Sequence, residues 1–161
     1  MKDIVLQGFV KDFAEEKGLT GLEESSLFEA FAVSSVLRKF HQSETPDSED
    51  FLTGGSGDAG IDAAAILVNG HPARTQADVD FFIDKLRRLE VEFVFIQAKT
   101  SAAFNAASIG TFVHGVNQFF APTPNIPFRG ELERLRTLKN YVYQRGITMQ
   151  RRAVQRSILS P

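Results

Sequence analysis

The sequence predicts an α/β fold in which a small sheet is flanked by several helices. Two stretches have the apolar, β-branched and aromatic composition of buried strands, residues 61–70 (IDAAAILVNG) and residues 91–99 (VEFVFIQAK). Elsewhere, apolar residues recur at the spacing of amphipathic helices. A length of 161 residues fits one core of good size. Together these observations predict an α/β arrangement with only two or three strands.

Two helices are expected before the first strand. Residues 2–17 place apolar side chains on one stripe, and a second helical segment follows with Ser25 or Ser26 as its N-cap. Residues 41–50 (HQSETPDSED) are polar and acidic, which is typical of an exposed loop. Four glycines, at positions 54, 55, 57 and 60, then predict a tight and irregular backbone.

The elements after the glycine-rich loop follow from the same patterns. In order, the sequence predicts a strand closed by the turn Asn69–Gly70, a helix over 75–89 capped by Thr75, a strand over 91–99, a helix over 101–120, three prolines within 121–128, and a final helix.

Because a sheet of two or three strands is thin for this much helix, we expect the chain to be the N-terminal piece of a longer protein, with a later strand still to come.

Charge is distributed unevenly along the chain. Residues 129–161 carry eight basic and two acidic residues, a net charge of +6, so the remainder carries −8 within an overall charge of −2. We therefore expect residues 1–128 to form one domain and residues 129–161 a basic helical tail that leads into a further domain. Such a tail can contact a nucleic-acid backbone, here through Arg145, Arg151 and Arg152. A solvated helix, or one that packs on further protein, explains the composition equally well.

Composition excludes several classes of protein. There is no cysteine, which excludes disulfides and thiolate zinc sites and fits a reducing, cytoplasmic compartment. No apolar run approaches the roughly 20 residues of a membrane span, and the charged N-terminal stretch predicts a helix instead of a signal peptide. The histidines, His41, His71 and His114, fall in different elements without the spacing of metal ligands.

The polar ends of the two strands are the candidate functional site. Asp62 starts the first strand directly after the glycine-rich loop, and Gln97 and Lys99 lie two apart, hence on one face, at the end of the second. If these strands pair, the three side chains converge at one edge of the sheet. Glu29, on an otherwise apolar helix, can add a second carboxylate. These oxygens suit a hard cation such as Mg²⁺, and a neighbouring lysine can stabilise charge on a phosphate.

Three motifs in this order resemble the PD-(D/E)XK nuclease superfamily. GDAGIDA at residues 57–63 followed by FIQAK at residues 95–99 is similar to the Mrr-like branch, in which Q-x-K stands for E-x-K. FEAFAVSSVL at residues 28–37 resembles the helix that carries the auxiliary glutamate of that branch. With the later FIQAKTSAAF and VNQFF, the resemblance extends over residues 20–121 to the N-terminal region of abortive-infection phage-resistance (AIPR) proteins.

The resemblance implies a restriction-endonuclease-like three-layer core, with a small mixed sheet flanked by helices and incomplete at its C-terminus. It implies an endonuclease that uses Mg²⁺ or Mn²⁺ to hydrolyse DNA, with RNA the less favoured substrate, in prokaryotic antiphage defence, and it leaves a homodimer open. The residues that it assigns are the metal ligands Asp62, Glu29 and Gln97, the catalytic lysine Lys99, and Gly57, Asp58 and Gly60, which shape the loop.

Residue 97 departs from the wider superfamily and leaves alternatives open. Glutamine is a neutral and weaker ligand than glutamate, so a metal would depend on Asp62, Glu29 and the substrate phosphate. A catalytically inactive nuclease-fold module that binds nucleic acid or protein is therefore a second hypothesis. A third is a small α/β domain whose polar strand ends serve packing, with Asp62 capping a turn and Lys99 extending along the surface to reach water.

Overall fold

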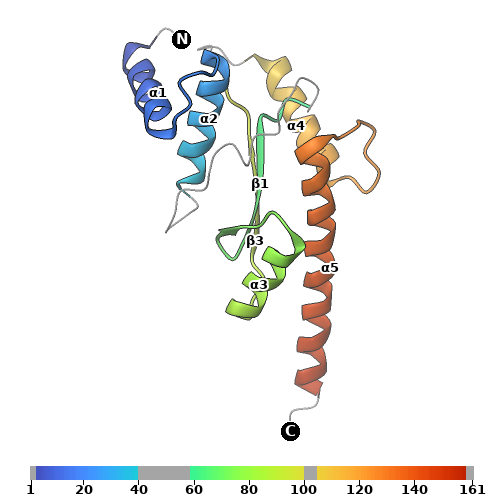
Figure 1. Ribbon diagram of the computed structural model, residues 1–161. Coiled ribbons are helices and arrows are strands. Elements are labelled where there is room, and N and C mark those ends of the chain that lie inside the picture. The colour runs from blue at the N-terminus through green and yellow to red at the C-terminus, as the bar shows by residue number, and fades with distance from the viewer. Residues whose placement is uncertain (1–2, 40–58, 100–104, 159–161) are drawn as a thin grey trace.

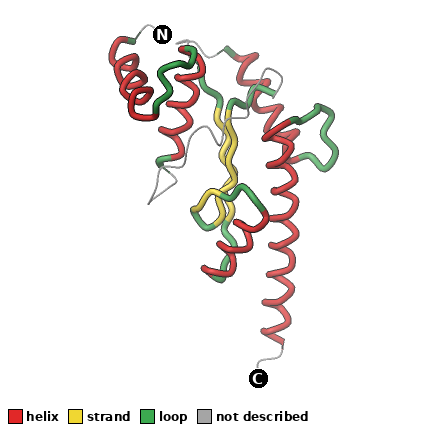
Figure 2. The backbone as a smooth tube through the Cα atoms, in the orientation of Figure 1, coloured by secondary structure: helices red, strands yellow, loops and turns green. Residues whose placement is uncertain are grey.

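The computed structural model of the protein describes residues 3–39, 59–99 and 105–158, the last nine of these as helical backbone only. Figures 1 and 2 show the arrangement of the elements. The structure has a mixed α/β fold, as the sequence predicted. In chain order the elements are α1 (Ile4–Lys17), α2 (Glu24–Leu37), β1 (Ala63–Val68), β2 (His71–Pro72), α3 (Gln76–Leu86), β3 (Val91–Ile96), α4 (Ala106–Phe120) and α5 (Gly130–Ile158).

The three strands form an antiparallel sheet with the order β2-β1-β3. β2 follows β1 through a two-residue turn, in which Asn69 and Gly70 have φ angles of 54° and 80°. β3 then runs along the other edge of β1, with Ala63 opposite Ile96 and Val68 opposite Val91. The prediction of a mixed sheet is therefore wrong for the part of the chain described, because both neighbours of β1 run in the direction opposite to it.

Helices cover both faces of the sheet. β1 is buried along its whole length, and its alternating side chains divide the core into two clusters. The even-numbered residues, from Ala64 to Val68, pack with side chains of α3, α4 and α5. The odd-numbered residues, from Ala63 to Leu67, pack with side chains of α2. Figure 1 shows these three layers, with α2 on one side of β1 and β3 and with α4 and α5 on the other.

The basic C-terminal segment is a helix whose first half belongs to the core. α5 buries an apolar stripe in the same cluster as β1, consisting of Leu132, Leu135, Leu138 and Val142. The segment that the charge pattern set apart at residue 129 thus packs against the sheet, and only its last turns extend past the other elements (Figure 1). Within the described residues no helix, α5 included, is both long and apolar enough to cross a membrane.

Two basic side chains of α5 hold the C-terminal end of α4. Lys139, only 2% exposed, donates from Nζ to the carbonyl oxygen of Phe119 at 2.9 Å. Arg136 donates to the carbonyl oxygens of Phe119 and Ala121 at 3.2 and 3.0 Å. The last carbonyls of a helix have no partner within it and carry partial negative charge, so cations stabilise this end. Part of the basic charge of residues 129–161 therefore serves the fold.

The turn between β1 and β2 is tied to the segment that leads into β3. The buried side chain of Asn69 donates to the carbonyl oxygens of Phe82 and Arg88 at 3.1 and 3.0 Å, and it accepts from the N–H of Glu90 at 2.9 Å. A further bond joins the N–H of Asn69 to the carbonyl oxygen of Glu90 at 2.8 Å. These contacts set where β3 begins beside β1, and hence where it ends.

Candidate metal and phosphate site at one edge of the sheet

Antiparallel pairing brings the two polar strand ends together. Asp62 precedes β1 and Gln97 follows β3, and the pairing of Ala63 with Ile96 makes them neighbours across the two strands. The N–H of Asp62 donates to the carbonyl oxygen of Ile96 at 2.9 Å, which extends the ladder by one residue. The predicted convergence of these two positions is therefore confirmed as a matter of geometry.

The carboxylate of Asp62 is fixed by the backbone of the segment that follows β3. Its Oδ2 accepts from the N–H of Ala98 at 2.6 Å. Burial raises the pKa of Asp62 above its ordinary value, and the bond from Ala98 and the positive charge of Lys99 oppose this rise. Asp62 is thus a half-buried acid whose carboxylate is oriented by a backbone hydrogen bond. Its net pKa is still raised, so the bond from Ala98 and the charge of Lys99 do not fully offset the cost of burying its negative charge.

Gln97 is oriented by the glycine-rich loop. Its Nε2 donates to the carbonyl oxygen of Gly60 at 2.8 Å, so the amide oxygen Oε1 is the atom of Gln97 suited to a cation. Gly60 has a φ of +74°, and a Cβ added to it would lie 3.0 Å from Gln97 Nε2. Gly60 therefore shapes the loop as the sequence predicted. Gly57 and Asp58, the other two positions predicted to shape it, lie outside the described residues.

Glu29 and Lys99 add a second carboxylate and an ammonium group in electrostatic range of Asp62. Glu29 lies on α2, and its pKa is raised by burial and then by the negative charge of Asp62, while Lys99 lowers it. Lys99 follows β3 and acts electrostatically on both carboxylates. Of the four residues predicted for the site, Asp62 and Gln97 are therefore neighbours across β1 and β3, and Glu29 and Lys99 lie within electrostatic range of Asp62.

The donor set at this edge fits a hard cation. Among the described residues, no three histidine, cysteine or acidic side chains are grouped so as to hold a metal ion. The available ligands are the carboxylates of Glu29 and Asp62, the oxygen of Gln97, and water. Mg²⁺ needs no more, because it is typically held by one or two carboxylates and keeps several waters. Two acids that repel each other also gain from a shared cation.

Of the three arginines predicted to contact nucleic acid, Arg145 is the one whose side chain the structure describes, and it pairs with α3 instead of the candidate site. Arg145 pairs with Asp80 of α3, with 2.7 Å between Nε and Oδ1, and Tyr141 donates to the other oxygen of Asp80 at 2.7 Å. Arg145 thus helps to fasten α5 to α3. The side chains of Arg151 and Arg152 lie outside the described residues.

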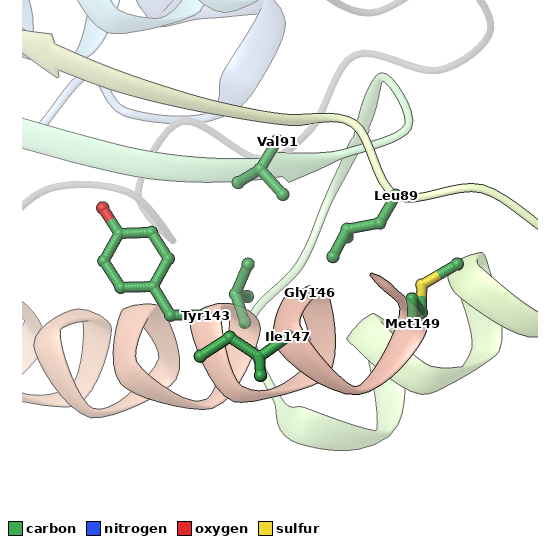
Figure 3. A pocket seen from close by; sticks show the side chains of 7 residues that line it. Leu89, Val91, Tyr143, Gly146, Ile147 and Met149 are labelled. Atoms are coloured by element: carbon green, nitrogen blue, oxygen red, sulfur yellow. The ribbon is translucent and has the colours of Figure 1, made fainter. Parts of the chain in front are cut away.

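Two pockets border β3, one at each end. The first has a volume of about 300 Å³ and is lined by Gln97 itself and by apolar side chains of α2, β3 and α4, namely Val36, Phe95, Ile96, Ile109 and Phe112. The second is larger, about 770 Å³, and lies where β3 begins, against α5 (Figure 3). Its lining contains none of the candidate site residues and consists of Leu89, Val91, Val142, Tyr143, Gly146, Ile147 and Met149.

Replacing Glu29 by glutamine is expected to stabilise the metal-free protein at neutral pH. The folded state raises the pKa of Glu29, so ionised Glu29 costs stability above that raised pKa, and the cost fades as the pH falls toward 4.5, the ordinary value. Unfolding in urea at pH 7 and at pH 4.5 measures this. The exposed Glu16 of α1, changed to glutamine, is the control. A Glu29→Gln protein less stable than wild type at pH 7 would contradict the arrangement of charges.

Backbone groups contribute to this site as much as side chains do. The N–H of Ala98 and the carbonyl oxygen of Gly60 orient Asp62 and Gln97. Their roles could not be predicted from the sequence, because every residue except proline carries both of these groups. Chemically, the edge offers two carboxylates and an amide oxygen to a cation, and an ammonium group to an anion.

No family model, curated protein or solved structure matches this chain.

Proposed function

We propose that this protein is a metal-dependent nuclease that hydrolyses phosphodiester bonds of DNA with Mg²⁺ or Mn²⁺. The observation that supports the proposal is the meeting of Asp62 and Gln97 through the antiparallel pairing of β1 and β3, with Glu29 and Lys99 in electrostatic range of Asp62. A role in prokaryotic antiphage defence is part of the proposal and rests on the resemblance of the motifs alone.

Each residue has a distinct part in the proposed reaction. Glu29 and Asp62 hold the cation, and Gln97 adds a neutral oxygen while its nitrogen keeps the loop at Gly60 in place. When bound, Mg²⁺ supplies Lewis-acid chemistry at a phosphate oxygen. Lys99 offers a positive charge to the phosphate, where negative charge develops during hydrolysis. The lysine cannot act as a ligand, because an ammonium group has no lone pair.

Incubation of the full chain with plasmid, linear duplex and single-stranded DNA tests the proposal. Cleavage is expected with Mg²⁺ or Mn²⁺ and should disappear when a chelator removes the metal. An Asp62→Asn protein purified in parallel controls for a contaminating nuclease. An RNA of the same sequence tests the choice of DNA. If the wild-type protein cleaves none of these substrates at any metal concentration, the proposal fails.

A second candidate is a nuclease-fold module that binds nucleic acid without cleaving it. The observation that favours it is Gln97, a neutral side chain whose nitrogen is already engaged by Gly60 at 2.8 Å. Binding would then persist in the presence of a chelator and weaken steeply with salt, since contacts to phosphates release counterions. Metal-independent binding together with absent cleavage would select this candidate over the enzyme.

A further inference from the structure

The loop that carries Gly60 and Asp62 rests directly on α4. Gly115, a buried residue of that helix, faces Ala59. A Cβ added at Gly115 would lie 2.5 Å from the carbonyl oxygen and 2.6 Å from the Cβ of Ala59. Real Cβ atoms essentially never approach other atoms so closely, so any side chain at position 115 must push the loop away from the helix.

Glycine is an intrinsically unfavourable residue for position 115, in the interior of the helix α4. Glycine in a helix interior costs about 1 kcal/mol relative to alanine, so the residue needs a reason in its surroundings. The same helix contains Gly110, around which an added Cβ would meet no atom of the described residues within 4 Å. Among the described residues, the contact with Ala59 is what distinguishes the two positions, and it accounts for a glycine at position 115.

Ala59 directly precedes Gly60 and lies three residues before Asp62, so its contact with Gly115 is close to the candidate site. Ala59 and Gly60 have φ angles of 55° and 74°, so this turn is in an uncommon backbone conformation. Gly60 is also close to α4, because an added Cβ would lie 3.3 Å from the backbone nitrogen of Phe112. The carbonyl oxygen of Gly60 accepts from Gln97, and Asp62 follows after the buried Ile61.

We propose that Gly115 is a positioning residue for the metal site at the edge of the sheet. Its missing side chain lets Ala59 lie against α4, and this places the Gly60 carbonyl under the Gln97 amide and Asp62 at the start of β1. The role in metal binding rests on the function proposed above. The role in orienting Gln97 follows from the contacts alone.

A pair of variants in one helix tests the proposal on the full chain. Gly115→Ala is expected to weaken Mg²⁺ binding, measured by calorimetry, by about 10- to 100-fold, which is the usual loss when a residue supporting a metal ligand is changed. Gly110→Ala is the matched control and should bind Mg²⁺ as wild type does. In the metal-free protein, NMR should show a shifted and faster-exchanging Gln97 side-chain amide in Gly115→Ala only.

A double variant separates positioning from a general loss of stability. Adding Ala59→Gly to Gly115→Ala removes the contact with the Ala59 methyl group but keeps that with its carbonyl oxygen. Both the Mg²⁺ affinity and the Gln97 resonance should then lie between those of Gly115→Ala and wild type. If Gly115→Ala does not fold, the double variant is measured against wild type with the same two readouts.

The outcomes distinguish this inference from the function it rests on. Wild-type Mg²⁺ affinity and a wild-type Gln97 resonance in the folded Gly115→Ala protein would overturn the positioning role, even if its thermal stability fell. If wild-type protein itself binds no Mg²⁺, the metal site fails, and the Gln97 resonance still decides whether Gly115 positions that side chain.

Discussion

Replacing Lys99 by methionine should reduce the rate of DNA cleavage by about 100- to 1000-fold, the usual loss when one group that stabilises transition-state charge is removed. Mg²⁺ affinity should change little, because Lys99 is not a ligand. The affinity for Mg²⁺ should even rise slightly in Lys99→Met. Lys99 lies close enough to lower the pKa of both Asp62 and Glu29, so its positive charge opposes the binding of Mg²⁺ at the same carboxylates.

Asp62→Asn is compared with Lys99→Met, because it is expected to change Mg²⁺ binding as well as the cleavage rate. An asparagine keeps an oxygen that can accept from the N–H of Ala98, as Asp62 does at 2.6 Å, so the strand ends should stay paired. It loses the negative charge, and Mg²⁺ affinity and cleavage should therefore fall together. Titration calorimetry and single-turnover cleavage at saturating Mg²⁺ measure the two quantities separately.

Lys85→Met provides the control for the loss of one positive charge. Lys85 is an exposed residue of α3, where its ammonium lies over the ring of Phe81, and its replacement should leave cleavage unchanged. A Lys99→Met protein that cleaves at the wild-type rate would show that Lys99 is an ordinary strand-end lysine. In that case the proposed nuclease would lack its charge-stabilising group.

Hydrophobic pattern was enough to predict most elements of this fold. The stripe of residues 2–17 is the helix α1, and Thr75 caps α3 as expected. The reciprocal bond from the backbone of Thr75 to the side chain of Asp78, which completes a capping box, was not predicted. The pair Asn69–Gly70 forms the turn that such pairs favour. These features are local, so neighbouring residues decide them. The convergence of Asp62 and Gln97 was also predictable, since it needed only that two strands pair.

The N-cap of α2, and features that depend on distant contacts, were missed or wrong. α2 begins at Glu24 with Glu23 as its N-cap, so neither Ser25 nor Ser26 caps it. Counting charge could not show that Lys139 is buried, because its burial depends on the carbonyl oxygen that the end of α4 offers it. A glycine such as Gly115 looks like an ordinary weak point of a helix until the residue packed against it is known.

The packing of α4 leads to the largest expected loss of stability, for Phe119→Ala. Phe119 is 1% exposed, and its ring lies 5.0, 5.4 and 6.1 Å from those of Phe95, Phe120 and Phe128. Truncating a buried phenylalanine costs about 3–5 kcal/mol, a large share of the 5–15 kcal/mol of stability that is typical of folded proteins. Urea denaturation followed by circular dichroism measures the loss.

The ring of Phe119 also supports the buried cation of α5, and this explains why the loss should lie at the upper end of that range. Nζ of Lys139 lies 5.4 Å from the centre of the ring, so removing the ring leaves the ammonium group of Lys139 facing a cavity. Phe81→Ala, at a position that is 58% exposed, is the control and should cost no more than about 0.5 kcal/mol. A cost below about 1 kcal/mol for Phe119→Ala would mean that Phe119 is not packed in the core cluster that α4 shares with β1 and α5. The position of α4, on which the proposed role of Gly115 depends, would then be wrong.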